Sequence, residues 1–195
     1  ALAFEDAVAL VAARGEAYDR GPEGRMAAVF PLRLEELEPL LERAHAEGVV
    51  EAVNLNSPTQ TVIAGETAGV EAAIALVEEE TFAMVRRLPG RIPLHASIFR
   101  PVAEAYAAAL EVAPWRTPRL TYRPNVYAIG MAQASPATLV RALERHVWCP
   151  VRWRESIDQA LEDHPHAALL ELGPGRVLPR LLRDGKGSGV NLLEG

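Results

Sequence analysis

The sequence predicts an α/β protein, and three observations support this fold class. The elements expected between residues 24 and 88 follow the order strand, helix, strand, strand, helix, strand. Helices and strands then alternate from residue 89 onward, which favours a mainly parallel sheet. The chain has 195 residues, of which 49% are hydrophobic and 24% charged, as is typical of a globular protein with a substantial core.

The first expected element is a helix at residues 4–18. Apolar residues such as Val8 and Val11 recur there at helical spacing, and Gly21-Pro22 ends the pattern. Six shorter elements follow, namely a strand at 26–32, a helix at 35–48, strands at 49–54 and 61–64, a helix at 67–80 and a strand at 82–88. This order is the ferredoxin-like pattern, with four strands in one sheet and both helices on one face. We therefore expect a small ferredoxin-like domain at residues 24–88.

The pattern changes after Pro89-Gly90. The sequence predicts a helix at 101–110, a strand at 120–126, helices at 135–146 and 153–163, and an apolar strand at 167–172 that enters Gly173-Pro174-Gly175. We assign residues 1–23 and 89–195 to a second, larger domain with a parallel sheet.

Charge and cysteine content exclude several classes of protein. With 20 basic and 26 acidic side chains the formal charge is −6, which argues against a nucleic-acid partner. Cys149 is the only cysteine, so the chain cannot form an internal disulfide or a cysteine metal cluster. The apolar runs are too short to span a membrane. We expect a cytoplasmic protein with no membrane partner, no metal and no bound cofactor.

His95 lies in the segment Arg91-Ile-Pro-Leu-His-Ala-Ser-Ile-Phe-Arg-Pro101, which leads from a strand end through a loop into a helix. In α/β enzymes such loops carry catalytic groups. Imidazole also exchanges protons near neutral pH. Taken alone, however, a histidine in this position is more often a structural residue.

Three further motifs give the segment a context. They are Asn54-Leu-Asn-Ser-Pro-Thr-Gln-Thr-Val-Ile-Ala-Gly65, Cys149-Pro-Val-Arg-Trp153 and Glu171-Leu-Gly-Pro-Gly-Arg-Val-Leu178. In this order, with His95 between the first and the second, the chain resembles the malonyl-CoA:acyl-carrier-protein transacylases and related acyltransferase domains. The resemblance runs from about residue 4 to residue 182. Two family motifs, a glutamine-containing glycine loop and the Gly-His-Ser-x-Gly nucleophile elbow, are absent from these residues.

The resemblance implies a catalytic role for two residues. His95 corresponds to the general base and acid that takes a proton from a serine and later returns it. The position matched by Arg152 supplies a backbone carbonyl that orients the imidazole, in place of a triad carboxylate. The structural alternatives are a helix-capping histidine and, at residues 150–153, simply the start of a helix.

Three more residues are implied as substrate contacts. Arg14 matches the arginine that binds the free carboxylate of a malonyl group through two parallel donors. Leu94 takes the position that lines the acyl pocket, where the family commonly has serine or phenylalanine, so a substituted malonyl group is an alternative substrate. Asn56 is expected to shape the cleft beside His95, although a turn would also explain it. Two basic clusters could dock an anionic partner or be ordinary solvated faces; one consists of Arg86, Arg87 and Arg91, and the other of Arg176, Arg180, Arg183 and Lys186.

The implied function is a portion of an acyltransferase of fatty-acid or polyketide biosynthesis. It would move a malonyl or substituted malonyl group from coenzyme A, as substrate, to the phosphopantetheine thiol of an acyl carrier protein through a serine ester. The serine would come from a companion chain or segment that carries the nucleophile elbow, and the larger domain would be α/β-hydrolase-like. A hydrolase of acyl thioesters and a non-catalytic, carrier-protein-binding scaffold remain alternatives.

Overall fold

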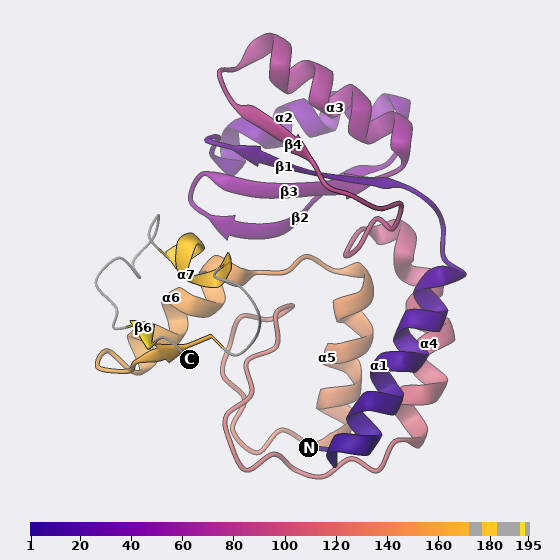
Figure 1. The fold of residues 1–195 in the computed structure, drawn as a ribbon, viewed down its shortest axis with the longest axis vertical. Coiled ribbons are helices and arrows are strands. Elements are labelled where there is room, and N and C mark those ends of the chain that lie inside the picture. Colours follow the sequence, from indigo (N-terminus) through magenta and orange to yellow (C-terminus); the bar gives the residue numbers. More distant parts are fainter. Residues whose placement is uncertain (172–176, 183–191, 194–195) are drawn as a thin grey trace.

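The computed structural model describes residues 1–171, 177–182 and 192–193 (Figure 1). The elements are, in order, α1 (Phe4–Asp19), β1 (Arg25–Phe30), α2 (Leu34–Ala44), a 3₁₀ turn (His45–Glu47), β2 (Val50–Ser57), β3 (Gln60–Gly65), α3 (Thr67–Glu80), β4 (Met84–Arg87), a 3₁₀ turn (Ser97–Phe99), α4 (Arg100–Val112), α5 (Pro136–Trp148), α6 (Trp153–Asp163), β5 (Leu169–Leu170), α7 (Val177–Leu182) and β6 (Leu192–Leu193).

The first sheet has four antiparallel strands in the order β2-β3-β1-β4. Its elements follow the strand–helix order that the sequence predicts for residues 24–88. Helices α2 and α3 lie together on one face of this sheet, as Figure 1 shows. Strands β3 and β2 approach very closely at Gly65, where a Cβ atom would lie 1.9 Å from the carbonyl oxygen of Val49. Only glycine fits there without moving the backbone.

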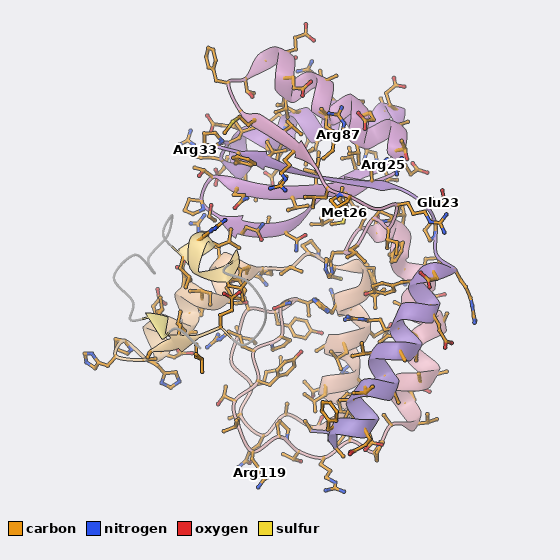
Figure 2. All side chains as sticks on the ribbon, in the orientation of Figure 1. Glu23, Arg25, Met26, Arg33, Arg87 and Arg119 are labelled. Atoms are coloured by element: carbon orange, nitrogen blue, oxygen red, sulfur yellow. The ribbon has the colours of Figure 1, made fainter. Side chains whose placement is uncertain are left out.

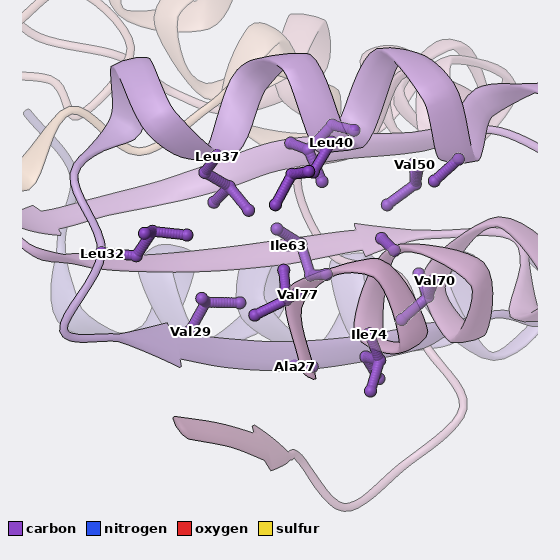
Figure 3. Close-up of a cluster of buried hydrophobic side chains, with 13 residues drawn as sticks. Ala27, Val29, Leu32, Leu37, Leu40, Val50, Ile63, Val70, Ile74 and Val77 are labelled. Atoms are coloured by element: carbon purple, nitrogen blue, oxygen red, sulfur yellow. The ribbon is translucent and has the colours of Figure 1, made fainter. Parts of the chain in front are cut away.

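Side chains of the sheet are buried on both faces, because successive residues of a strand point to opposite sides. Ala27, Val29 and Ile63 face α2 and α3 (Figure 3). The core on that side consists of Ala27, Val29, Leu32, Leu37, Leu40, Leu41, Ala44, Val50, Ile63, Val70, Ala73, Ile74 and Val77. On the other face, Ala28 and Val62 pack with Ala96, the residue after His95. This face of the sheet thus packs against the loop that carries His95.

The rest of the described chain is mainly helical. Helices α1, α4 and α5 lie side by side (Figure 1) and share a core centred on Phe99, Leu110 and Val147. The chain links α5 back to the sheet through Val151, which pairs in parallel with Asn54 of β2.

The prediction of a strand at 120–126 was wrong. Within the described ranges this segment forms only an isolated antiparallel bridge between Tyr122 and Met131. Pro124 has no N–H to donate to a neighbouring strand, which disfavours a continuous ladder. The apolar strand expected at 167–172 is present at Leu169–Leu170, where it pairs in parallel with β6. The larger parallel sheet stays a prediction.

Candidate active site

His95 lies in the loop between β4 and α4, in a backbone conformation that few residues adopt. Its φ is +67°, in the left-handed region. Such a conformation costs about 1–3 kcal/mol and persists only where surrounding contacts impose it. One contact is the backbone N–H of His95, which donates to the carbonyl of Val147 at 3.2 Å. The other is the packing of the adjacent Ala96 against the sheet.

The imidazole of His95 is oriented by a second carbonyl of the same helix end. Its Nδ1 lies 2.7 Å from the carbonyl oxygen of His146. Since a carbonyl can only accept, Nδ1 carries the proton and Nε2 keeps its lone pair. No described residue hydrogen-bonds to Nε2. Burial, together with the charge of Arg14, lowers the pKa of His95 even though the bond to His146 opposes the shift. The ring is therefore a neutral base with a free nitrogen at neutral pH.

The prediction that Arg152 supplies the orienting carbonyl was wrong. That carbonyl accepts the N–H of Ser156 at 2.9 Å, because Arg152 caps the start of α6. The carbonyl of His146, by contrast, has no partner within its own helix. Its helical partner would be the residue four positions later, which is Pro150, and proline has no N–H. The end of α5 therefore presents an unpaired acceptor to the histidine loop.

His146 is the residue that the sequence interpretation missed. Its ring stacks obliquely on His95, with 4.8 Å between ring centroids and an angle of 43° between the planes. Its Nε2 lies 3.0 Å from Nδ2 of Asn125. Burial lowers the pKa of His146 to about 4, and the charge of Arg14, together with that of His95 when it is protonated, adds to the shift. A signal existed in the sequence, since Pro150 predicts the free carbonyl four residues before it.

Arg14 lies in the C-terminal half of α1. Its guanidinium carbon is 5.5 Å from the ring centre of Tyr18, and its charge lowers the pKa of both His95 and His146. Arg14 also lines a mainly apolar pocket of about 490 Å³, together with residues of α1, α4, α5 and the loop at 115–122. The structure thus brings the predicted carboxylate-binding residue into the field of His95.

Leu94 and Asn56 have less distinctive surroundings. Leu94 is half-buried and packs against the core of α1, α4 and α5. Asn56 lies half-buried on β2, and the structure records no hydrogen bond from its side chain to another described residue. Their roles in the acyl pocket and the cleft stay predictions.

The first basic cluster is largely paired. Arg87 donates to Glu71 at 2.6 Å, and Arg91 donates to Glu23 at 2.8 Å. Figure 2 labels one residue of each pair, Arg87 and Glu23. These exposed pairs leave less positive charge available to an anionic partner. In the second cluster, Arg180 is exposed, while Arg176, Arg183 and Lys186 lie outside the described residues, as does the Gly173-Pro174-Gly175 turn.

Two features are absent from residues 1–171, 177–182 and 192–193. No group of three or more histidine, cysteine, aspartate or glutamate side chains in these ranges could hold a metal ion. None of the helices there is long and apolar enough to cross a membrane. Cys149 is a buried free thiol, and burial raises its pKa.

Comparison with known proteins confirms the resemblance. The model of the acyl transferase domain family matches residues 1–191. The malonyl CoA-acyl carrier protein transacylase of Haemophilus influenzae is 36% identical over 185 residues, covering 93% of this chain and 58% of the relative. That of Bacillus subtilis is 32% identical over 187 residues, covering 94% of this chain and 58% of the relative. The chain therefore spans less than two thirds of the length of these relatives.

Solved structures agree with the sequence comparison. The acyl-carrier-protein S-malonyltransferase of Burkholderia pseudomallei superimposes with a TM-score of 0.92 at 32% identity, covering 100% of this chain and 63% of that one. The Streptococcus pneumoniae structure gives a TM-score of 0.89 at 31% identity, with the same coverage of 100% and 63%. The described residues thus have the α/β fold of these proteins.

Proposed function

Because the chain belongs to the acyl transferase domain family, we propose that it carries the acid–base half of an acyltransferase site. The acyl group is malonyl or a substituted malonyl, the donor is its coenzyme A thioester, and the acceptor is the phosphopantetheine thiol of an acyl carrier protein. The observation that carries the proposal is the geometry of His95, whose Nδ1 is held by a backbone carbonyl at 2.7 Å while Nε2 is left free.

The proposed reaction is a double displacement in which His95 moves one proton at Nε2. Nε2 takes the proton of a serine hydroxyl as its oxygen attacks the thioester carbonyl. The bond to sulfur then breaks, and coenzyme A leaves with that proton. In the second half, the carrier thiol gives its proton to Nε2 and attacks the serine ester, whose oxygen recovers the proton. A carbonyl behind Nδ1 stabilises the imidazolium less than a carboxylate would.

The serine is proposed to come from outside these 195 residues. No described serine hydroxyl is hydrogen-bonded to His95, and the Gly-His-Ser-x-Gly pattern does not occur in the sequence. Helix α1 also leaves apolar side chains open to solvent, with Phe4 79%, Val8 50% and Val11 60% exposed. Such a row of exposed apolar residues is typical of a surface that another segment covers. We propose that the elbow-bearing segment lies there.

Substrate and partner are inferred from Arg14 and from the relatives. The guanidinium of Arg14, whose charge reaches His95, can bind the carboxylate of malonyl with two parallel hydrogen bonds. The relatives are named malonyl CoA-acyl carrier protein transacylases. A structurally similar chain, with a TM-score of 0.91 at 28% identity, is described as a malonyl-transacylase in complex with a type II PKS acyl-carrier protein. We further propose a ferredoxin-like domain at residues 24–88 and a hydrolase-like domain formed by residues 1–23 and 89–195.

The test uses the reconstituted enzyme, which is this chain together with the elbow-bearing segment. We expect His95→Ala to slow malonyl transfer by roughly 10²–10⁴-fold, the usual contribution of an acid–base group. His45→Ala is the matched control, because His45 is exposed and lies outside the site. Transfer that does not depend on His95 would refute the proposal. Release of malonate to water, with no malonyl carrier protein formed, would instead identify a hydrolase.

A further inference from the structure

Three hydrogen bonds connect the start of α6 to the proposed base. The N–H of Arg152 donates to the carbonyl of Asn125 at 2.9 Å. The side-chain amide nitrogen of Asn125 lies 3.0 Å from Nε2 of His146. The carbonyl of His146 accepts from Nδ1 of His95 at 2.7 Å. We propose that the side chains of Asn125 and His146 are positioning residues, which hold the end of α5 so that its carbonyl orients His95.

The loop that carries Asn125 is fixed at both ends. Nη1 of Arg123 donates to the carbonyl of Ala128 at 2.7 Å, and Nη2 of Arg123 pairs with Asp163 of α6 at 2.5 Å. The N–H of Ala128 donates to the carbonyl of Pro124 at 3.1 Å, which closes a turn around Asn125. Asn125 therefore approaches His146 from a hydrogen-bonded loop that is separate from α5.

The chemistry of the middle bond defines the state of His146. An amide nitrogen can donate but not accept, so Nε2 of His146 must be unprotonated and its Nδ1 must carry the proton. A protonated Nε2 would point its hydrogen at the amide hydrogens of Asn125. The contact thus keeps His146 neutral. When His95 takes a proton, no other positive charge then lies on the ring whose centre is 4.8 Å from its own.

The two side chains act on His95 only through the backbone of residue 146. Displacing that carbonyl would leave Nδ1 of His95 without an acceptor, and the ring could then rotate or adopt the other tautomer. The inference rests on the proposed function, because orientation of His95 matters only if His95 exchanges protons. Side-chain variants of residue 146 retain the carbonyl itself, so they isolate the effect of its position.

Kinetics of the reconstituted enzyme provide the first test. His146→Leu and Asn125→Leu should lower kcat for malonyl transfer by roughly 10- to 100-fold with little change in KM. His146→Gln should remain close to wild type, because the amide oxygen of glutamine can accept the same bond from Asn125. Equal activity of the leucine variants and wild type, or failure of glutamine to rescue, would overturn the proposal.

The second test is independent of activity. Nitrogen-15 NMR of the histidine rings in the same enzyme should show the Nδ1–H tautomer for both His95 and His146. Asn125→Asp is nearly isosteric but offers only acceptors, so His146 should gain a proton at Nε2. If wild-type His146 already carries a proton on Nε2, the inferred contact does not exist. If the tautomers are as expected but transfer does not depend on His95, the proposed function fails and the contact stands.

Discussion

Acid should destabilise this fold through His146, and the structure gives the size of the effect. In the folded chain His146 is mostly buried and accepts a bond from Asn125, so it stays neutral until its pKa of about 4 is reached. In the unfolded chain the same imidazole is exposed to water and binds a proton near its ordinary value of 6.5.

The sign follows from proton linkage. Because the folded pKa is depressed, the unfolded state binds more protons between these two values, and the free energy of unfolding falls as the pH decreases. Between about pH 7.5 and about pH 4.5, His146 should reduce that free energy by about 2.5 kcal/mol. The loss begins as the pH falls below the unfolded value and is complete below about 4. Burial also lowers the pKa of His95, so its contribution has the same sign.

Urea denaturation at the two pH values would measure this difference, with wild type compared to His146→Gln. Glutamine cannot titrate but can still accept from Asn125, so this variant should lose about 2.5 kcal/mol less than wild type on acidification. His45→Gln, at an exposed position, controls for the removal of an imidazole elsewhere. Equal losses in wild type and His146→Gln would refute the assignment of His146 as a buried neutral group.

Three further predictions concern the substrate and the fold. Arg14→Ala should weaken loading from malonyl-CoA by about 1.5–3 kcal/mol, whereas loading from acetyl-CoA should survive. Equal losses with the two thioesters would show that Arg14 has a structural role. Ile63→Ala should lower the free energy of unfolding, measured by urea denaturation, by about 2–5 kcal/mol, because removal of this fully buried side chain leaves a cavity. A smaller loss would mean that the surrounding sheet closes the cavity. Gly65→Ala should destabilise the sheet, since its Cβ would lie 1.9 Å from a carbonyl oxygen. Gly15 lies in α1 with open space around it, so Gly15→Ala should instead stabilise the protein by about 0.5–1 kcal/mol.

Much of the fold could be predicted from the sequence because its determinants are local. Apolar periodicity and turn residues predicted the six elements of residues 24–88 in the right order, and the helix expected at 67–80 has those bounds. The loop position of His95 was predicted because proline and apolar residues mark its segment as a connection between two elements. The strand expected at 120–126 failed because a strand also needs a partner, and only Tyr122 finds one among the described residues.

The surroundings of His95 depended on tertiary structure. The family resemblance at residues 149–153 implied Arg152 as the source of the orienting carbonyl, whereas the acceptor is His146, 51 residues from His95 along the chain. The ends of α5 and α6 determine which backbone carbonyls are free. The packing of α5 relative to the sheet then determines which free carbonyl contacts the imidazole. Residue identity therefore determined that an imidazole would lie in the loop before α4. Only the packing of distant segments decided that Asn125 and His146 would surround it, because hydrogen bonds of about 3 Å between such segments exist only once the core has formed.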